Sequence, residues 1–179
     1  MFSISFRGSK RAFETLSEQE ILALAISSEE DDARIYLAYA DQLRGEFPQS
    51  AKVFEDMAEV EHTHRNMLIA MHRERFGERI PLIRREHVRG FYDRKPDWLR
   101  KSQTLAQIRA EAERMEEGAA RFYHSAMQRT SDAGIRKLLG DLALAEQGHE
   151  ETAAMLEEKH VSGDARVEED DTVRRQFIL

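Results

Sequence analysis

Two Glu-x-x-His motifs supply residues suited to metal chemistry. Glu61 with His64 forms the first motif, and Glu146 with His149 forms the second. Residues three apart lie on one face of a helix, so the carboxylate and the imidazole of each motif can reach the same ion. A carboxylate-rich site with one imidazole per metal suits iron or manganese, and zinc can also occupy it. The motifs therefore predict a metal site built on two helices.

Two further Glu-x-x-His matches occur, at Glu59 with His62 and at Glu157 with His160. Apolar residues recur at helical spacing on both sides of Glu61, whereas polar residues surround Glu59 in the same way. Glu157 falls in the last turn of the final predicted helix. We therefore assign both of these matches to the surface.

Two more glutamates interrupt apolar stripes, each on a helix without a buried histidine motif. Glu30 lies in the middle of a stripe from Ala23 to Ala40, and Glu116 lies in one from Leu105 to Met127. An ionised carboxylate in a dry core costs several kcal/mol unless it is paired or coordinated. Two divalent ions would satisfy four such groups. The predicted ligands are Glu30, Glu61, His64, Glu116, Glu146 and His149.

Neighbouring residues are weaker candidates. Glu113 lies one turn before Glu116 and is either an additional ligand or part of a solvated helix face. Three tyrosines could donate hydrogen bonds beside the site or simply fill the core, namely Tyr36, Tyr39 and Tyr123. Three histidines have no partner at ligand spacing and are predicted to lie on the surface, namely His72, His87 and His124.

Four long segments with helical periodicity would position these residues, at about 17–45, 48–77, 102–129 and 132–160. Capping patterns mark the first start, at Ser17, and the third, around Thr104. Short connections predict two antiparallel hairpins, and the long stretch 77–101 predicts a crossover with a short helix near 85–92. The predicted fold is an all-α, ferritin-like four-helix bundle. The predicted divisions are an N-terminal extension (1–16), the bundle (17–160) and an acidic linker or tail (161–179).

Composition excludes several classes of function. The net charge of −7 argues against nucleic-acid binding, and the absence of cysteine excludes disulfides, thiolate zinc sites and iron–sulfur clusters. The spacing from Glu30 to Glu61 nearly equals that from Glu116 to Glu146, as in a duplicated hairpin. A two-fold pair of such hairpins gives the di-iron carboxylate pattern of four Glu and two His.

With these residues identified, the chain resembles the rubrerythrin branch of the ferritin-like superfamily over about 17–160. E-D-D-A-R-I-Y from Glu30 and E-E-G-A-A-R-F-Y from Glu116 resemble that branch's first and third helix motifs. E-V-E-H and A-E-Q-G-H resemble its second and fourth. Rubrerythrins usually add a cysteine-bound iron domain, which this chain lacks. They also carry a carboxylate where this chain has Ala119, so movement of an iron between ligands is not expected unless Glu113 substitutes.

Within this branch the chain is most similar to the N-terminal domain of the bacterial membrane-bound ferritin (erythrin–vacuolar iron transporter) family. The resemblance implies iron export and peroxide resistance through a membrane domain beyond this chain. It also implies a location on the cytoplasmic face of the bacterial inner membrane. The acidic tail ending in R-R-Q-F-I-L fits a linker to such a domain.

The resulting expectation is a site of two iron ions that binds Fe(II) and oxidises it with oxygen or hydrogen peroxide. Glu61 and Glu146 would bridge the ions, with Glu30 and His64 at one end and Glu116 and His149 at the other. One alternative is a non-catalytic iron-collecting or iron-sensing cap on a transporter, which would use the same ligands. Another is a helical interaction protein with Glu–His–Arg pairs in its core. A homodimer is expected because ferritin-like bundles commonly pair.

Overall fold

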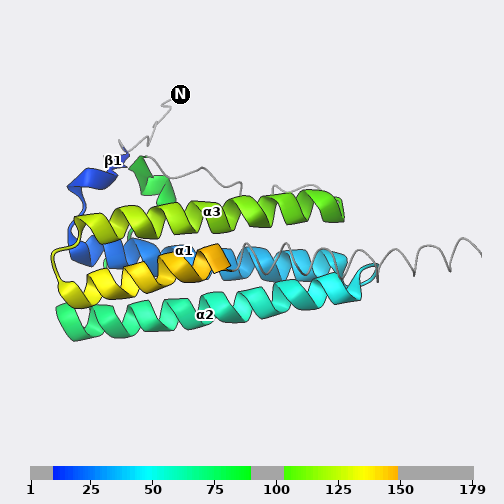
Figure 1. The fold of residues 1–179 in the computed structure, drawn as a ribbon, viewed down its shortest axis with the longest axis horizontal. Coiled ribbons are helices and arrows are strands. Elements are labelled where there is room, and N and C mark those ends of the chain that lie inside the picture. Colours follow the sequence, from blue (N-terminus) through cyan, green and yellow to red (C-terminus); the bar gives the residue numbers. More distant parts are fainter. Residues whose placement is uncertain (1–9, 90–102, 149–179) are drawn as a thin grey trace, which may run out of the picture.

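The computed structural model describes residues 10–89 and 103–148 of the 179-residue chain. Four helices dominate it (Figure 1): α1 (Glu18–Leu43), α2 (Pro48–Phe76), α3 (Leu105–Arg129) and a fourth helix over residues 133–148. Two short strands, β1 (Arg11–Ala12) and β2 (Val88–Arg89), form a parallel pair. Each strand adjoins a single 3₁₀ turn, η1 (Phe13–Thr15) or η2 (Arg85–His87).

Side-chain caps fix where the helices begin. Ser17 accepts a hydrogen bond from the backbone N–H of Glu20 at 3.3 Å, and the Glu20 carboxylate accepts one from the N–H of Ser17 at 2.9 Å. Thr104 and Gln107 form the same reciprocal pair at the start of α3. These bonds satisfy N–H groups that the first turn of a helix leaves without partners. Both predicted capping boxes are therefore confirmed.

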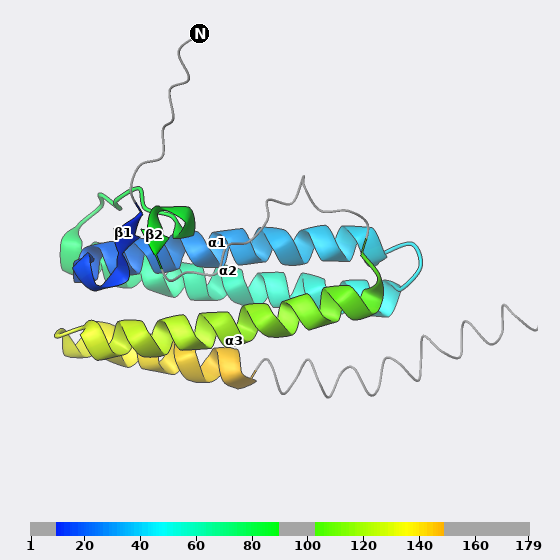
Figure 2. The same ribbon diagram turned by 90° about the horizontal axis from the view of Figure 1, so that it is seen from above.

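The helices form two hairpins packed as two layers (Figure 2). α1 and α2 run antiparallel through a short turn, and so do α3 and the fourth helix. Both views show α2 and α3 running in the same direction, so residues 77–104 connect opposite ends of the bundle. This is the connectivity of a ferritin-like bundle with one long crossover. The predicted fold class is confirmed.

The predicted short helix in the crossover is wrong for the described residues. Only η2, at Arg85–His87, has helical backbone, and β2 follows immediately. The backbone of β2 pairs with β1, with Val88 beside Arg11, and this pairing replaces the hydrogen bonds that a helix would need. Residues 90–92 lie outside the described part of the chain. The first part of the crossover is therefore an extended segment whose strand β2 pairs with β1 of the N-terminal segment.

Two separate apolar cores fill the bundle, and the candidate ligands lie between them. On α1, Ile26 belongs to one core and Ala33 to the other. On α2, Ala58 and Leu68 are divided in the same way. The layer between the cores holds buried carboxylates instead of apolar side chains. The fold thus brings a polar layer to the middle of an otherwise apolar interior.

Candidate metal centre

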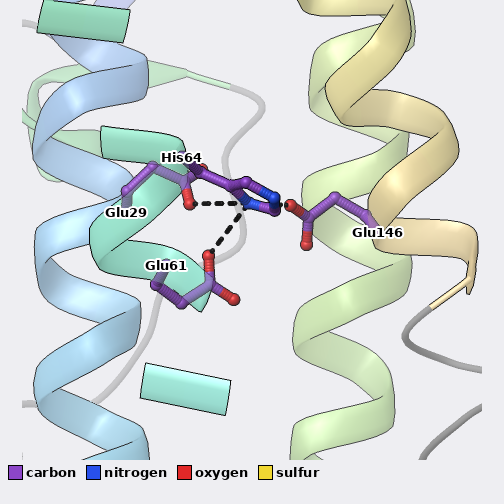
Figure 3. A group of neighbouring side chains, drawn as sticks. All are labelled: Glu29, Glu61, His64 and Glu146. Atoms are coloured by element: carbon purple, nitrogen blue, oxygen red, sulfur yellow. Dashed lines mark ion pairs between the residues drawn. The ribbon is translucent and has the colours of Figure 1, made fainter. Parts of the chain in front are cut away.

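Four side chains from three helices converge in the polar layer (Figure 3). They are Glu29 of α1, Glu61 and His64 of α2, and Glu146 of the fourth helix. Each offers one ligand atom, and these atoms all lie within 4.8 Å of one another. Nδ1 of His64 lies 3.0 Å from Oε1 of Glu146 and 3.6 Å from Oε2 of both Glu29 and Glu61. These separations allow several ligand atoms to reach one ion.

The cluster is almost completely shielded from solvent. None of its four side chains belongs to a residue more than 6% exposed, and Glu116 of α3 is buried in the same way. Charged groups in such surroundings are normally paired or bound to metal. The layer therefore concentrates four carboxyl groups and one imidazole where water screens them poorly.

Burial and mutual repulsion set the protonation of these groups. Burial raises the pKa of Glu61 and of Glu146 well above the ordinary carboxyl value. Burial raises the pKa of Glu29, but its interactions with the neighbouring Glu61 and His64 outweigh burial and lower the pKa. Burial alone would lower the pKa of His64, but the carboxylates of Glu146 and Glu29 outweigh this effect and raise the pKa to about 10. Without metal, these shifts favour the protonated forms of Glu61, Glu146 and His64.

Two buried tyrosines link the hairpins across the site in a reciprocal pattern. The hydroxyl of Tyr36 on α1 donates to Oε1 of Glu116 on α3 at 2.5 Å. The hydroxyl of Tyr123 on α3 donates to Oε1 of Glu29 on α1. Burial and the nearby carboxylates raise the pKa of both tyrosines, so both hydroxyls keep their protons. Each tyrosine orients a carboxylate that belongs to the other hairpin.

The donor set fits a divalent cation. Oε2 of Glu29 and Oε1 of Glu146 are buried and make no hydrogen bond among the described residues. Their positive partner in this arrangement is the protonated His64 imidazole, 3.6 Å and 3.0 Å away, and a metal ion would replace that proton as the common partner of both oxygens. Carboxylate oxygens with an imidazole nitrogen are ligands suited to iron and manganese. Glu29, Glu61, His64 and Glu146 can therefore hold metal.

Comparison with known proteins places this arrangement in a family. The model of the rubrerythrin family matches residues 20–157, which is most of the chain. The chain belongs to the rubrerythrin family. No match was found among functionally curated proteins. The family assignment accounts for a carboxylate-rich layer inside a ferritin-like bundle.

Two solved structures share the fold of this rubrerythrin-family chain. A hypothetical protein from Pyrococcus furiosus is 21% identical with a TM-score of 0.67, and the match covers 84% of this chain and 94% of that one. A protein from Thermotoga maritima, described as a ferritin-like diiron-carboxylate protein, is 21% identical with a TM-score of 0.61. That match covers 80% of this chain and 95% of the Thermotoga chain. At this level of identity the likeness supports the fold.

The structure brings together most of the ligands predicted from sequence. Glu61, His64 and Glu146 lie in the cluster. Glu116 is buried in the same layer and accepts a hydrogen bond from Tyr36. His149 lies outside the described residues, as does the Glu157/His160 pair. Glu113, the weaker candidate, is exposed on α3 and is not one of the four residues of the cluster.

The predicted ligand Glu30 is misplaced by one residue. Its side chain is 42% exposed and pairs with Arg34, while Glu29 occupies the core position. A step of one residue turns a helix by about 100°, so adjacent glutamates cannot both face the core. Because Glu30 points outward in this fold, Glu29 replaces it as the candidate ligand from α1.

An internal match in the sequence could have identified Glu29. The segments E-E-D-D-A-R-I-Y, from Glu29, and E-E-G-A-A-R-F-Y, from Glu116, align without a gap. The alignment pairs Glu29 with Glu116 and Tyr36 with Tyr123, the four residues of the reciprocal hydrogen bonds. It also pairs Glu30 with Glu117, and each of these binds the arginine four residues later on the surface.

The histidine predictions are partly confirmed. His87 and His124 are exposed, and the exposed Glu59 lies 3.8 Å from His62 in a surface pair. His72, however, is completely buried, and neither of its ring nitrogens makes a hydrogen bond within the described part of the chain. It lies two turns beyond His64 on the same face of α2 and packs against Phe76. Its prediction as a surface residue is wrong because this inward face continues to the end of α2.

Proposed function

We propose that this bundle binds two iron ions in its polar layer and oxidises Fe(II) with oxygen or hydrogen peroxide. The observation that carries the proposal is the convergence of Glu29, Glu61, His64 and Glu146, with two buried carboxylate oxygens that lack hydrogen bonds. A core of this size would not retain so many acidic groups for packing alone, because each costs several kcal/mol when it is charged and unpaired. Manganese or zinc could substitute for iron in the same ligands.

In this proposal, each end of the site has one terminal carboxylate and one imidazole. Glu29 and His64 would hold one ion, Glu116 and His149 would hold the other, and Glu61 and Glu146 would be shared between them. Support comes from the hydrogen bonds of Tyr36 and Tyr123. Each tyrosine donates to one glutamate of the opposite hairpin, so Glu116 and Glu29 occupy equivalent positions in the two hairpins. This arrangement agrees with the duplicated-hairpin pattern of the sequence, with Glu29 in place of Glu30.

The iron supplies the electrons in this reaction. Each of two Fe(II) ions gives up one electron, and one hydrogen peroxide takes up both electrons with two protons to yield two waters. The carboxylates offset the added positive charge and favour the ferric state. Tyr36 and Tyr123 hold Glu116 and Glu29 in fixed orientations, and the two apolar cores limit the entry of water along the bundle.

We further propose that the domain serves iron detoxification and export together with a transporter-type membrane domain in a longer protein. Its place would then be the cytoplasmic face of the bacterial inner membrane, and the bundle would form a homodimer. The resemblance to the membrane-bound ferritin family supports these proposals. Among the described helices, none combines the length and the apolar character needed to cross a membrane.

A non-catalytic role as an iron-collecting or iron-sensing cap is the second candidate. One observation favours it. Rubrerythrins carry an additional carboxylate where this chain has Ala119, and Glu113, the nearby glutamate that could substitute for it, is exposed on α3. The site therefore lacks the additional carboxylate between which and its other ligands an iron would move in a peroxidase of this branch.

Mixing the metal-free protein with Fe(II) and then with oxygen or hydrogen peroxide tests the proposed oxidation. We expect a ferric absorbance band to rise faster with the parent protein than with Glu61→Ala/Glu146→Ala, which lacks both bridging carboxylates. Glu59→Ala, an exposed glutamate on the same helix, is the matched control and should behave like the parent. Equal rates for the double variant and the parent would contradict the proposal. Stoichiometric binding of iron without consumption of the oxidant would favour the cap.

A further inference from the structure

One arginine of the crossover reaches into the bundle beside the metal layer. Arg85 of η2 is only 7% exposed, and its guanidinium contacts two residues of α1. Nε donates to Oγ of Ser28 at 3.0 Å, and Nη2 donates to the backbone oxygen of Ser28 at 2.5 Å. Nη2 also lies 2.8 Å from Oδ2 of the buried Asp32. One planar side chain thus binds a single turn of α1 at three acceptors.

The two residues that Arg85 binds lie on either side of Glu29. Ser28 precedes Glu29 directly, and Asp32 lies one turn after Ser28 on the same face of α1. A second contact, from Oγ of Ser27 to the backbone oxygen of Ile83 at 3.0 Å, ties the crossover to the same turn. Just after Arg85, β2 of the crossover pairs with β1 of the N-terminal segment. The crossover therefore grips α1 at the turn that carries a candidate ligand.

The contacts of Arg85 with Ser28 and Asp32 restrain the rotation of α1 about its own axis. Glu29 and Glu30 are neighbours separated by about 100° around the helix, so a modest rotation would withdraw one and advance the other. Near its start, α1 is held by Glu18, which accepts hydrogen bonds from Ser131, and by Gln19, which donates to the backbone oxygen of Arg79. The Arg85 contacts add a restraint at the turn that carries Glu29. The contacts of Arg85 on α1 are with Ser28 and Asp32, so we infer that it acts on Glu29 by holding the backbone of this turn. A guanidinium fork supplies fixed geometry that a lysine cannot.

We propose that Arg85 is a positioning residue that, with Asp32, sets Glu29 into the metal layer. The inference rests on metal binding by this layer, as proposed above, and adds a crossover residue that is not itself a ligand. Residues that orient metal ligands from outside typically change metal affinity by 10-fold to 100-fold when they are replaced. The expected effect of losing the Arg85 fork lies in that range.

Cobalt(II) titration followed by visible absorption gives the test, because the spectrum of cobalt reports the geometry of its ligands. Two variants are compared with the parent at a temperature well below unfolding. Arg85→Lys keeps the charge opposite Asp32 and removes the fork. Arg85→Gln/Asp32→Asn removes both charges together, so no uncompensated buried charge remains. The control is Arg84→Gln, since Arg84 is exposed and lies 3.9 Å from Asp31.

Both Arg85 variants should bind Co(II) about 10-fold more weakly than the parent and give an altered visible spectrum. Arg84→Gln should match the parent in both respects. Parent-like affinity and spectrum in a folded variant that lacks the fork would overturn the positioning role, even if its Tm had fallen, because that pattern describes a purely structural pair. Failure of the parent itself to bind Co(II) or iron would reject the proposed metal site, and the positioning role with it.

Discussion

Glu29→Gln should weaken metal binding by more than about 100-fold, whereas Glu30→Gln should leave it unchanged. Glutamine has nearly the shape of glutamate but lacks the charge that a metal ligand provides. Replacement of residues outside the ligand set already costs 10-fold to 100-fold in affinity, so loss of a direct ligand should cost more. Glu29 is buried in the cluster, while the Glu30 side chain pairs with Arg34 on the surface. The measurement is a competition titration of Fe(II) or Co(II) against a chelator.

Glu117→Gln provides a second control for this experiment. Glu117 corresponds to Glu30 in the internal match and pairs with Arg121 on the surface of α3. Both surface variants should bind metal like the parent, and circular dichroism should show that all three variants are folded. Equal losses in Glu29→Gln and Glu30→Gln, or a larger loss in Glu30→Gln, would contradict the placement of α1 described above.

The metal-free protein should lose stability as the pH rises from about 6.5 to 10. Burial raises the pKa of Glu61 and Glu146 in the folded state, so their stabilising contribution is complete below the unfolded carboxyl pKa and is lost as the pH rises. His64 acts in the same direction. Its pKa rises from 6.5 to about 10 on folding, so its contribution is complete below 6.5 and is lost through pH 10. Glu29, with a lowered pKa, contributes stability that is lost only in acid.

Thermal unfolding monitored by circular dichroism at a series of pH values measures this effect. One pKa unit corresponds to about 1.4 kcal/mol, so even a fraction of these shifts should lower Tm by at least about 3 °C across the interval. Glu61→Gln/Glu146→Gln should show a shallower dependence on pH. Glu59→Gln/His62→Gln, which removes an exposed pair at the same spacing, should keep the parent's slope. A slope unaffected by the buried pair of substitutions would show that the cluster does not hold the inferred protons.

The features that sequence could predict are those written in local patterns. The capping boxes at Ser17 and Thr104 depend on residues three apart, and the Glu61/His64 motif depends on one helical face. Both kinds of pattern are settled within a few residues of the chain, so neither needs knowledge of distant contacts. The surface position of Glu59 and His62 was predictable in the same way, from the polar residues that surround them at helical spacing.

The error at Glu30 has a specific physical cause. Residues 21–26 of α1 are buried without interruption, so the apolar residues there do not define which face points inward. Leu37, which follows Glu30 at helical spacing, is 40% exposed, whereas Tyr36 beside it is buried. Periodicity alone could not distinguish Glu29 from Glu30 under these conditions. The distinction follows from Tyr123 and Arg85, which come from α3 and the crossover.

Tertiary contacts also explain the buried groups that sequence did not predict. Arg85 lies in the charged crossover, where the sequence predicted a short helix, and it becomes buried because Ser28 accepts its hydrogen bonds and Asp32 pairs with its charge. His72 has no partner at ligand spacing, yet the bundle encloses it completely. Neither outcome follows from local spacing, because each depends on which segments the fold places against the residue.

Anomalous diffraction at the iron absorption edge, from crystals of the iron-loaded protein, tests the central claim most directly. We expect two iron peaks per chain in the layer between the two apolar cores. One should lie among Glu29, Glu61, His64 and Glu146, and the second on the side of Glu116. Fewer than one iron per chain, or iron bound beside Glu30 on the surface, would contradict the claim.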